Sequence, residues 1–479
     1  MSEKELEVQR HAVMNLASSS VITIIGFLAT IFYAHWVGAE VLGTYFLFLS
    51  FYSVLSLFTD LGINYASTQR ISEGKEQDFF YSAGFIIRVA LFILLTMILV
   101  LFQGRFADLN EAGLFWILIG ILGLGTIQSY VGMAIGASNR LGLASTTSLI
   151  NNLVRILVQV ITVFLGYQVS GLIGGLVAGL FIQLIIDAKY VNYHLKKFEW
   201  VHVKGLLTFS KWAIFISAGT ILFDNIPLIL IAYFLPVSEV GIFGVCWAFS
   251  FFALFISTAL VNSLYVKVSR WTAQKDMNAI TVSLSRATTY SLVFALPIFS
   301  GSILLGYDLL YYIYGASFAA GATTLIIIIA MRGVQSILNL YTSFLMATDH
   351  AKQAVVGILA GISVNIVLCI ILIPQIGIVG AAIGAFFNVI ISFFIAFVYL
   401  ARIIPLTFEK TTIKHIVFAS VIMTISLIIL GWLPLSQSTI QTILMVLTGA
   451  VIYFLVLLKL NKQICDDSLR ILKITWIPK

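Results

Sequence analysis

Three arginines lie inside long apolar stretches of the chain: Arg88, Arg155 and Arg332. A charged side chain at the centre of a bilayer costs roughly 2.5–3.5 kcal/mol on insertion scales, so such a residue should face protein or water. The guanidinium group is planar, stays charged and matches the oxygen atoms of phosphate groups. These residues are therefore the first candidates for binding an anionic head group.

Two of the arginines belong to polar stripes that follow the helical repeat. The stripes are Ser148, Asn152, Arg155 and Gln159, and Arg332, Gln335, Asn339 and Thr342, each at steps of three or four residues. One interpretation is a wet cavity in which Asn152, Arg155 and Gln159, and Arg332, Gln335 and Asn339, contact a substrate. The other is structural, because polar side chains also join membrane helices at about 0.6 kcal/mol per hydrogen bond.

The remaining intramembrane charges have separate interpretations. Arg88 has mostly apolar neighbours, so it either extends to the inner surface, pairs with Asp60 or binds substrate. Asp224 lies near the middle of its apolar run, and Pro227 leaves a backbone carbonyl partly free beside it. Such a place suits a proton or a small cation, so Asp224 is a candidate for H⁺ or Na⁺ coupling. Asp60, closer to the inner face, is a candidate for gating, coupling or a structural role.

The elements that position these residues are about fourteen hydrophobic stretches, most near the ~20 residues that a helix needs to cross a bilayer. The chain has 479 residues, of which 60% are apolar and 10% charged, which excludes an ordinary soluble domain. The sequence predicts an all-α integral membrane protein. The predicted spans are 14–36, 43–66, 80–103, 113–136, 146–167, 170–192, 211–234, 241–266, 283–305, 319–346, 354–373, 378–401, 415–433 and 438–459.

The positive charges separate cleanly across these spans. Of the 27 Lys and Arg residues, Arg105 alone falls on the outer side when residue 1 is placed inside, and three more lie in apolar runs. An even number of spans with both termini in the cytoplasm explains this distribution. The net charge of +7 is then an inner-face excess, and no nucleic-acid partner is expected.

The longest inner connections divide the chain into an N-lobe at 1–204, a C-lobe at 205–408, and two further helices with a tail at 409–479. The lobes resemble repeats, since "AEVLGTYF" (39–46) matches "VSEVGIFG" (237–244), and Gly171 and Gly174 match Gly377 and Gly380. Six helices per repeat keep the orientation, so a pseudo-twofold axis along the membrane normal is expected. Two such lobes predict a central cleft and alternating access.

Other chemistry finds little support. The three cysteines and six histidines show no ligand spacing, so neither a disulfide framework nor a metal site is expected. The predicted outer loops are short and almost uncharged, which argues against a membrane-embedded polymerase or glycosyltransferase. No catalytic residues are assigned, and a transporter is expected rather than an enzyme.

The segment "HWVGAEVLGTYFLFLSFYSVLSLFTDLGINYASTQRIS" (35–72) resembles the amino-terminal signature of the Wzx-type polysaccharide-biosynthesis flippases, including Asp60, Leu61, Gly62 and Arg70. "YGASFAAGATTLIIIIA" (314–330) and the run from 345 to 385 resemble the second half of that family. The resemblance implies the multidrug/oligosaccharidyl-lipid/polysaccharide exporter fold, with two six-helix lobes plus two helices. It also implies a cationic cavity, which suits Arg88, Arg155 and Arg332.

The resemblance further implies that polyprenyl-(di)phosphate-linked oligosaccharides are moved from the inner to the outer leaflet of the plasma membrane. The expected partners are the lipid-linked oligosaccharide, membrane lipids, and glycosyltransferases or a polymerase of the same pathway, and a monomer is expected. The alternative is a cation-coupled multidrug antiporter of the same superfamily. That function favours intramembrane acids, whereas arginines equal or outnumber them here.

Overall fold

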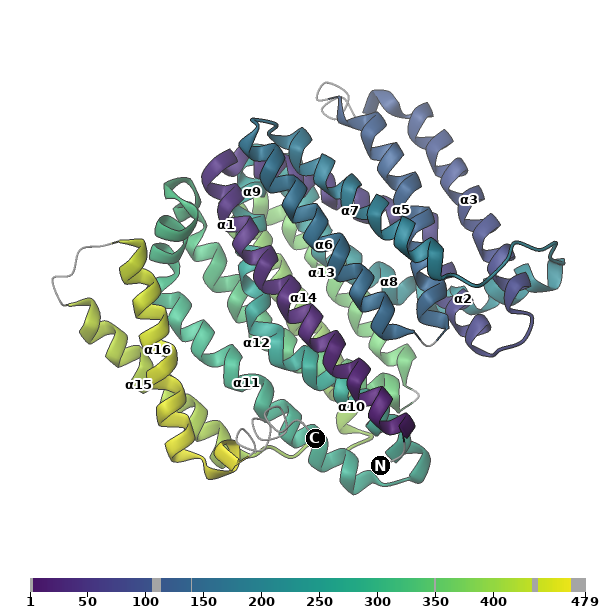
Figure 1. The fold of residues 1–479 in the computed structure, drawn as a ribbon. Helices are drawn as coiled ribbons and strands as arrows, with labels where there is room; N and C mark the ends of the chain where they lie inside the picture. Colours follow the sequence, from purple (N-terminus) through teal and green to yellow (C-terminus); the bar gives the residue numbers. More distant parts are fainter. Residues whose placement is uncertain (1–2, 106–112, 139, 349, 433–437, 467–479) are drawn as a thin grey trace. The chain divides into compact units, whose positions relative to one another are not determined.

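The computed structural model describes residues 3–105, 113–138, 140–348, 350–432 and 438–466, which form helices joined by short connections, without a strand in these ranges (Figure 1). The all-α prediction is therefore confirmed. The chain forms two compact units, Met1–Gly241 and Ile242–Lys479. The predicted lobe boundary at 204 lies inside α8 (Trp200–Phe234), which packs on three helices of the first unit.

The first unit contains α1 (Glu3–Asp60), α2 (Ile63–Ser72), α3 (Gln77–Leu101), η1 (Gln103–Arg105), α5 (Leu114–Ala137), α6 (Leu141–Phe164), α7 (Val169–Tyr190) and α8. The unit boundary falls within α9 (Val237–Ser250). The second unit continues with η2 (Phe251–Leu254), α10 (Phe255–Gln274), α11 (Met277–Asp308), η3 (Leu309–Tyr314), η4 (Ala316–Gly321), α12 (Ala322–Ala347), α13 (Ala351–Ile376), α14 (Ile378–Ala401), α15 (Lys410–Gly431) and α16 (Thr439–Leu460).

Among the described residues, 13 helical segments are long and apolar enough to cross a membrane. The first of them, Ile22–Asp60, is far longer than one crossing needs, at 39 residues. Gly38 interrupts it with φ 76° and ψ −178°, a conformation open mainly to glycine. Because this kink separates two helices, the segments agree with the fourteen spans predicted from the sequence.

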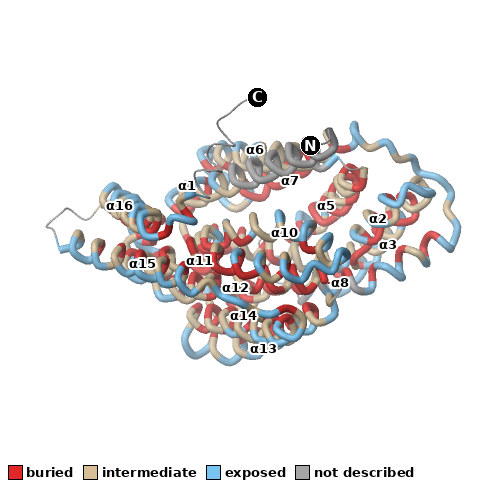
Figure 2. Tube along the Cα trace, turned by 90° about the horizontal axis from the view of Figure 1, so that it is seen from below, coloured by how far each residue is buried: buried red, intermediate tan, exposed pale blue. Residues whose placement is uncertain are grey.

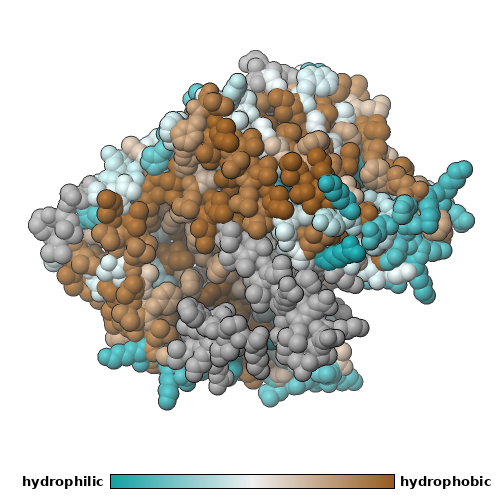
Figure 3. All heavy atoms as spheres, in the orientation of Figure 1, coloured by the Kyte–Doolittle hydropathy of each residue, from teal (hydrophilic) through white to brown (hydrophobic). Residues whose placement is uncertain are grey.

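Large apolar side chains remain exposed along the helices of both units. Leu101 and Tyr233 are each 79% exposed, and Ile440 is 72% exposed. Figure 3 shows apolar residues over much of the face it draws, while Figure 2 shows buried positions concentrated along helices such as α12. Exposure of this extent is expected where the solvent is lipid, since an apolar surface costs nothing against acyl chains.

Glycines bring neighbouring helices into close contact in each unit. A Cβ atom at Gly171 would lie 2.7 Å from the Thr162 hydroxyl, so α7 rests almost directly on α6. On α14, a Cβ at Gly380 would lie 2.7 Å from the Leu372 carbonyl oxygen of α13. Small residues that let backbones approach are the usual contact between membrane helices.

The glycines at these helix contacts are not the set that was matched between the predicted repeats. A Cβ atom added at Gly174 would meet no atom of the described residues within 4 Å, and Gly377 ends α13 with φ 66°. The contact glycines are instead Gly171 and Gly175 in one unit and Gly380 and Gly384 in the other. Positions four apart share a helix face, whereas the proposed match used a spacing of three.

The match between Gly43 and Gly241 has a direct structural counterpart within the first unit. A Cβ atom at Gly43 would lie 3.0 Å from the Gly241 amide nitrogen, and one at Gly241 would lie 3.0 Å from the Gly43 amide nitrogen. The two added Cβ atoms would also collide with the carbonyls of Val237 and Ala39, respectively. The contact is therefore reciprocal, with each glycine leaving room for the backbone around the other.

The neighbouring glycines of α7 provide a stability test. We expect Gly175→Ala to destabilise the protein by about 1–3 kcal/mol, because its Cβ would lie 2.7 Å from the Arg155 carbonyl oxygen and must push α6 away. Gly174→Ala is the matched control, since a Cβ there has room among the described residues and alanine favours helix formation. Thermal unfolding of the detergent-solubilised protein measures both variants. Equal melting temperatures would contradict this account of α6–α7 packing.

Candidate functional site

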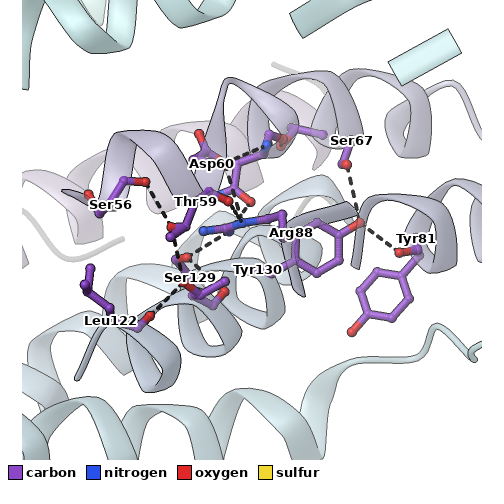
Figure 4. A network of polar contacts seen from close by, with 12 residues as sticks. Ser56, Thr59, Asp60, Ser67, Tyr81, Arg88, Leu122, Ser129 and Tyr130 are labelled. Carbon is purple, nitrogen blue, oxygen red and sulfur yellow. Dashed lines mark hydrogen bonds and ion pairs between the residues drawn. The ribbon is translucent and has the colours of Figure 1, made fainter. Parts of the chain in front are cut away.

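Arg88 lies at the centre of a polar network that joins α1, α2, α3 and α5 (Figure 4). The guanidinium donates from Nη1 to Asn64 Oδ1 at 2.7 Å and to Ser129 Oγ at 2.9 Å. Its Nε donates to the Thr59 carbonyl at 3.3 Å and lies 3.7 Å from Asp60 Oδ1. Arg88 is 2% exposed, so of the interpretations left open by the sequence, the structure has the ion pair with Asp60 and not an extension to the surface.

Asp60 owes its position to the end of the long first helix. α1 ends at Asp60, Gly62 follows with φ 77°, and the Asp60 carboxylate accepts the Asn64 backbone N–H at 3.0 Å at the start of α2. One carboxylate oxygen thus serves both the helix start and the Arg88 guanidinium. In this arrangement Arg88 and Asp60 form an ion pair, and their contacts join α1, α2 and α3 of the first unit.

Arg155 has different surroundings from Arg88. Its guanidinium donates to Asn152 Oδ1 at 2.7 Å, its Nε is buried without a hydrogen-bond partner, and it forms no ion pair with a described carboxylate. Asn152 itself donates to the Ser148 carbonyl at 2.9 Å, so the amide holds one end of the guanidinium in place. Arg155 is only partly buried. A positive charge with an unused donor inside a membrane helix is suited to an anion.

Gln159, one turn further along α6, is part of the packing of the first unit. It is 2% exposed and donates to the Tyr45 hydroxyl at 2.9 Å and the Leu172 carbonyl at 2.7 Å. Tyr33 donates to its Oε1 at 3.0 Å. With each of these groups bonded, Gln159 is anchored to α1 and α7, next to Arg155 but not open to a ligand in this conformation.

Arg332 lies in an aromatic cage in the second unit. Its Cζ atom is 4.3 Å from the centre of the Trp247 ring and 4.3 Å from that of Phe251. Nε donates to Ser250 Oγ at 3.0 Å and Nη1 donates to Gln335 Oε1 at 2.6 Å. Arg332 is 1% exposed, so a substrate reaches it only after these rings or the Gln335 side chain move. Gln335 and Asn339 are themselves partly buried.

Asp224 lies in α8 of the first unit, in the turn before Pro227. The Asp224 side chain is partly buried, and Asn225 beside it donates to the Ile221 carbonyl at 2.8 Å. The sequence placed this carboxylate and Pro227 within one membrane helix, and in the structure α8 runs through both residues. Among the described residues, no group of three or more His, Cys, Asp or Glu side chains could hold a metal ion.

One intramembrane acid was absent from the sequence-based candidates. Asp187, in the last turn of α7, is fully buried, and its Oδ1 has no hydrogen-bond partner. A signal was present in the sequence, because Gln183 stands four residues before it in an otherwise apolar run. The nearby Lys189 made the segment resemble an ordinary inner-face helix end.

Comparisons with known proteins agree with this architecture. The "Probable low-salt glycan biosynthesis flippase Agl15" of Haloferax volcanii is 24% identical over 449 residues, covering 92% of this chain and 95% of that protein. Among solved structures, lipid II flippase MurJ in an inward closed conformation has a TM-score of 0.74 at 17% identity, over 93% of this chain and 98% of that one.

A multidrug resistance transporter of the MATE family, in an inward-facing conformation, has a TM-score of 0.63 at 12% identity, over 82% of this chain and 98% of that one. These two structures establish a shared fold. The sequence model of the family described as "Polysaccharide biosynthesis protein" matches residues 9–250, just over half of the chain. This multi-pass membrane protein therefore belongs to the polysaccharide biosynthesis protein family.

Proposed function

We propose that this protein is a flippase that moves polyprenyl-(di)phosphate-linked oligosaccharides from the inner to the outer leaflet of the plasma membrane by alternating access. The family membership and the similarity to proteins named as glycan and lipid II flippases support this function. The observation that carries it is Arg155, a guanidinium within a membrane helix that has a buried, unused N–H and no described acidic partner.

In this mechanism Arg155 and Asn152 bind the phosphate while the polyprenyl chain stays in lipid. Charge-assisted hydrogen bonds from a guanidinium to phosphate oxygens are about twice as strong as neutral ones. Arg332, with Gln335 and Asn339, is a second contact that becomes available when its aromatic cage opens. Arg88 and Gln159 act through the packing that positions α6 and its neighbours.

The driving force is a separate part of the proposal. H⁺ or Na⁺ bound at Asp224 or Asp60 would couple translocation to an ion gradient, since one charge crossing 100 mV supplies about 2.3 kcal/mol. The lysine and arginine distribution supports cytoplasmic placement of both termini. The protein acts as a monomer and receives its substrate from glycosyltransferases, or passes it to a polymerase, of the same pathway.

The second candidate function is a cation-coupled drug antiporter, favoured by the fold shared with the MATE transporter and by the intramembrane Asp224. The two functions separate in proteoliposomes. We expect the purified protein to make a polyprenyl-diphosphate oligosaccharide in the opposite leaflet accessible to an added glycosidase. We expect no extrusion of a lipophilic cationic dye under an imposed H⁺ or Na⁺ gradient. Dye extrusion without lipid translocation would reverse the assignment.

A further inference from the structure

Asp187 is a carboxylate without the charge compensation that Asp60 has. It is fully buried at the contact of α5, α6 and α7, and it forms no salt bridge with a described residue. Gln128 donates to its Oδ2 at 3.4 Å, and the polar side chains of Thr147 and Gln183 lie nearby. Its other oxygen, Oδ1, is buried without a partner.

An ionised carboxylate in such a place is costly, because an isolated buried charge loses its hydration and gains nothing comparable from neutral neighbours. Either a cation or a proton removes this cost. A metal cation needs several oxygen ligands around it. The surroundings instead supply the N–H donor of Gln128, and a Cβ atom added at Gly132 would lie 3.2 Å from Oδ2, so α5 packs closely on that side. A proton needs only the one unused oxygen.

The charged and titratable side chains on the surrounding helices either bond to residues other than Asp187 or are exposed. Arg155 of α6 bonds to Asn152, and Lys189 of α7 is exposed. The Tyr130 hydroxyl of α5 donates to the Tyr81 carbonyl at 2.8 Å. The α1 helix, which also packs on α7, carries Asp60 beside Arg88, with His35 and Glu40 exposed.

We propose that Asp187 is a proton-binding site of the first unit, distinct from Asp60 and Asp224, and that the proton is held on Oδ1. A series of polar side chains leads from it toward Arg155. Gln183 stands one turn before Asp187 on α7 and accepts a 2.7 Å hydrogen bond from Asn151, which stands one turn before Arg155 on α6. Loss of the proton places a negative charge in the α5–α6–α7 contact and changes the position of α6. The proton site stands on its own, whereas its link to transport rests on the proposed flippase function.

The primary test is infrared spectroscopy of the full-length protein in nanodiscs. The spectrum recorded at pH 8.5 is subtracted from the spectrum recorded at pH 5.5. We expect a protonated-carboxyl C=O band that is present in the wild type and lost in Asp187→Asn. Asp78→Asn is the matched control, because the Asp78 carboxylate lies 2.6 Å from Lys196 near the start of α3 and should leave the band unchanged. A spectrum identical in wild type and Asp187→Asn would overturn the site. Loss of the band on adding NaCl at constant pH would show that the site binds Na⁺, and the assignment to a proton would be wrong.

Thermal stability supplies a readout that does not depend on assigning a band. The protonated, neutral form of Asp187 fits the buried site. The protein is therefore expected to be more stable at low pH, and to lose this stability as the pH rises and Asp187 ionises. We expect the wild-type melting temperature to fall by about 3 °C or more relative to that of Asp187→Asn between pH 5.5 and 8.5. Asparagine resembles the neutral acid, so the variant should fold. Parallel melting curves across this range would contradict the proposal.

Lipid translocation then tests the link to transport. We expect the flipping rate of the wild type to change with pH in a way that Asp187→Asn does not share. If the two pH profiles coincide while the infrared band is present, the coupling is overturned. If the wild type flips no lipid-linked oligosaccharide, the proposed function fails, and the infrared result still decides the proton site.

Discussion

Arg155→Ala is expected to slow translocation of a lipid-linked oligosaccharide by about 10- to 100-fold. Hydrogen bonds to charged groups contribute about 1.5–3 kcal/mol, and each 1.4 kcal/mol is a factor of ten in affinity. Arg155→Lys should be intermediate, because lysine keeps the charge but lacks the planar fork. The measurement is the rate at which the oligosaccharide becomes accessible in proteoliposomes, at substrate concentrations below saturation.

The control is Arg140→Ala, at the exposed start of the same helix α6. It removes an equal charge outside the apolar part of the helix, so it should leave the rate nearly unchanged. Equal rates for wild type and Arg155→Ala would refute the phosphate role. Equal losses in both variants would show that only the overall positive charge matters.

Arg88→Met is expected to lower the free energy of unfolding by about 3–5 kcal/mol. It leaves Asp60 partly buried without its cation, and removing one member of a buried ion pair has an effect of this size. It also leaves Asn64 and Ser129 without a donor. Thermal or denaturant unfolding in detergent measures the change.

The double variant Arg88→Met with Asp60→Asn separates the ion pair from simple packing. The double variant has no unpaired buried carboxylate, so it should recover part of the unfolding free energy that Arg88→Met loses. If the double variant is less stable than Arg88→Met by the full effect of Asp60→Asn alone, the two residues act independently. The role assigned to Asp60 in holding Arg88 would then be wrong.

The sequence predicted the helices well, because a bilayer demands long apolar segments and internal hydrogen bonding of the backbone. It placed a break between residues 36 and 43, where the structure has the kink at Gly38, but it did not predict that the helix after this kink ends at Asp60, inside the predicted span 43–66. It also did not predict that Gly175, rather than Gly174, lies in the contact between α6 and α7. Which face of a helix carries the contact is decided by packing against a second helix, here the approach of α7 to α6.

The candidate site was predictable in part. The Arg88–Asp60 pair was among the open interpretations, because both residues stand within apolar runs near the same face of the membrane. The burial of Gln159 and the cage around Arg332 were not predictable, since Tyr45 and Trp247 lie far from them in sequence. Helical periodicity describes one helix at a time. The partner that satisfies each polar group comes from another.

The aromatic cage of Arg332 has a consequence for biosynthesis. Ser250 precedes Arg332 by 82 residues, and Trp247 and Phe251 stand beside it in the chain, so all three leave the ribosome well before α12. When α12 enters the membrane, the Arg332 guanidinium can replace its bound water by contacts with the Trp247 and Phe251 rings and the Ser250 hydroxyl, which are already synthesised. This lowers the penalty of placing an arginine in the hydrocarbon region. The order of synthesis thus favours integration of α12 by the translocon, and a chain lacking the earlier aromatics should integrate this segment less efficiently.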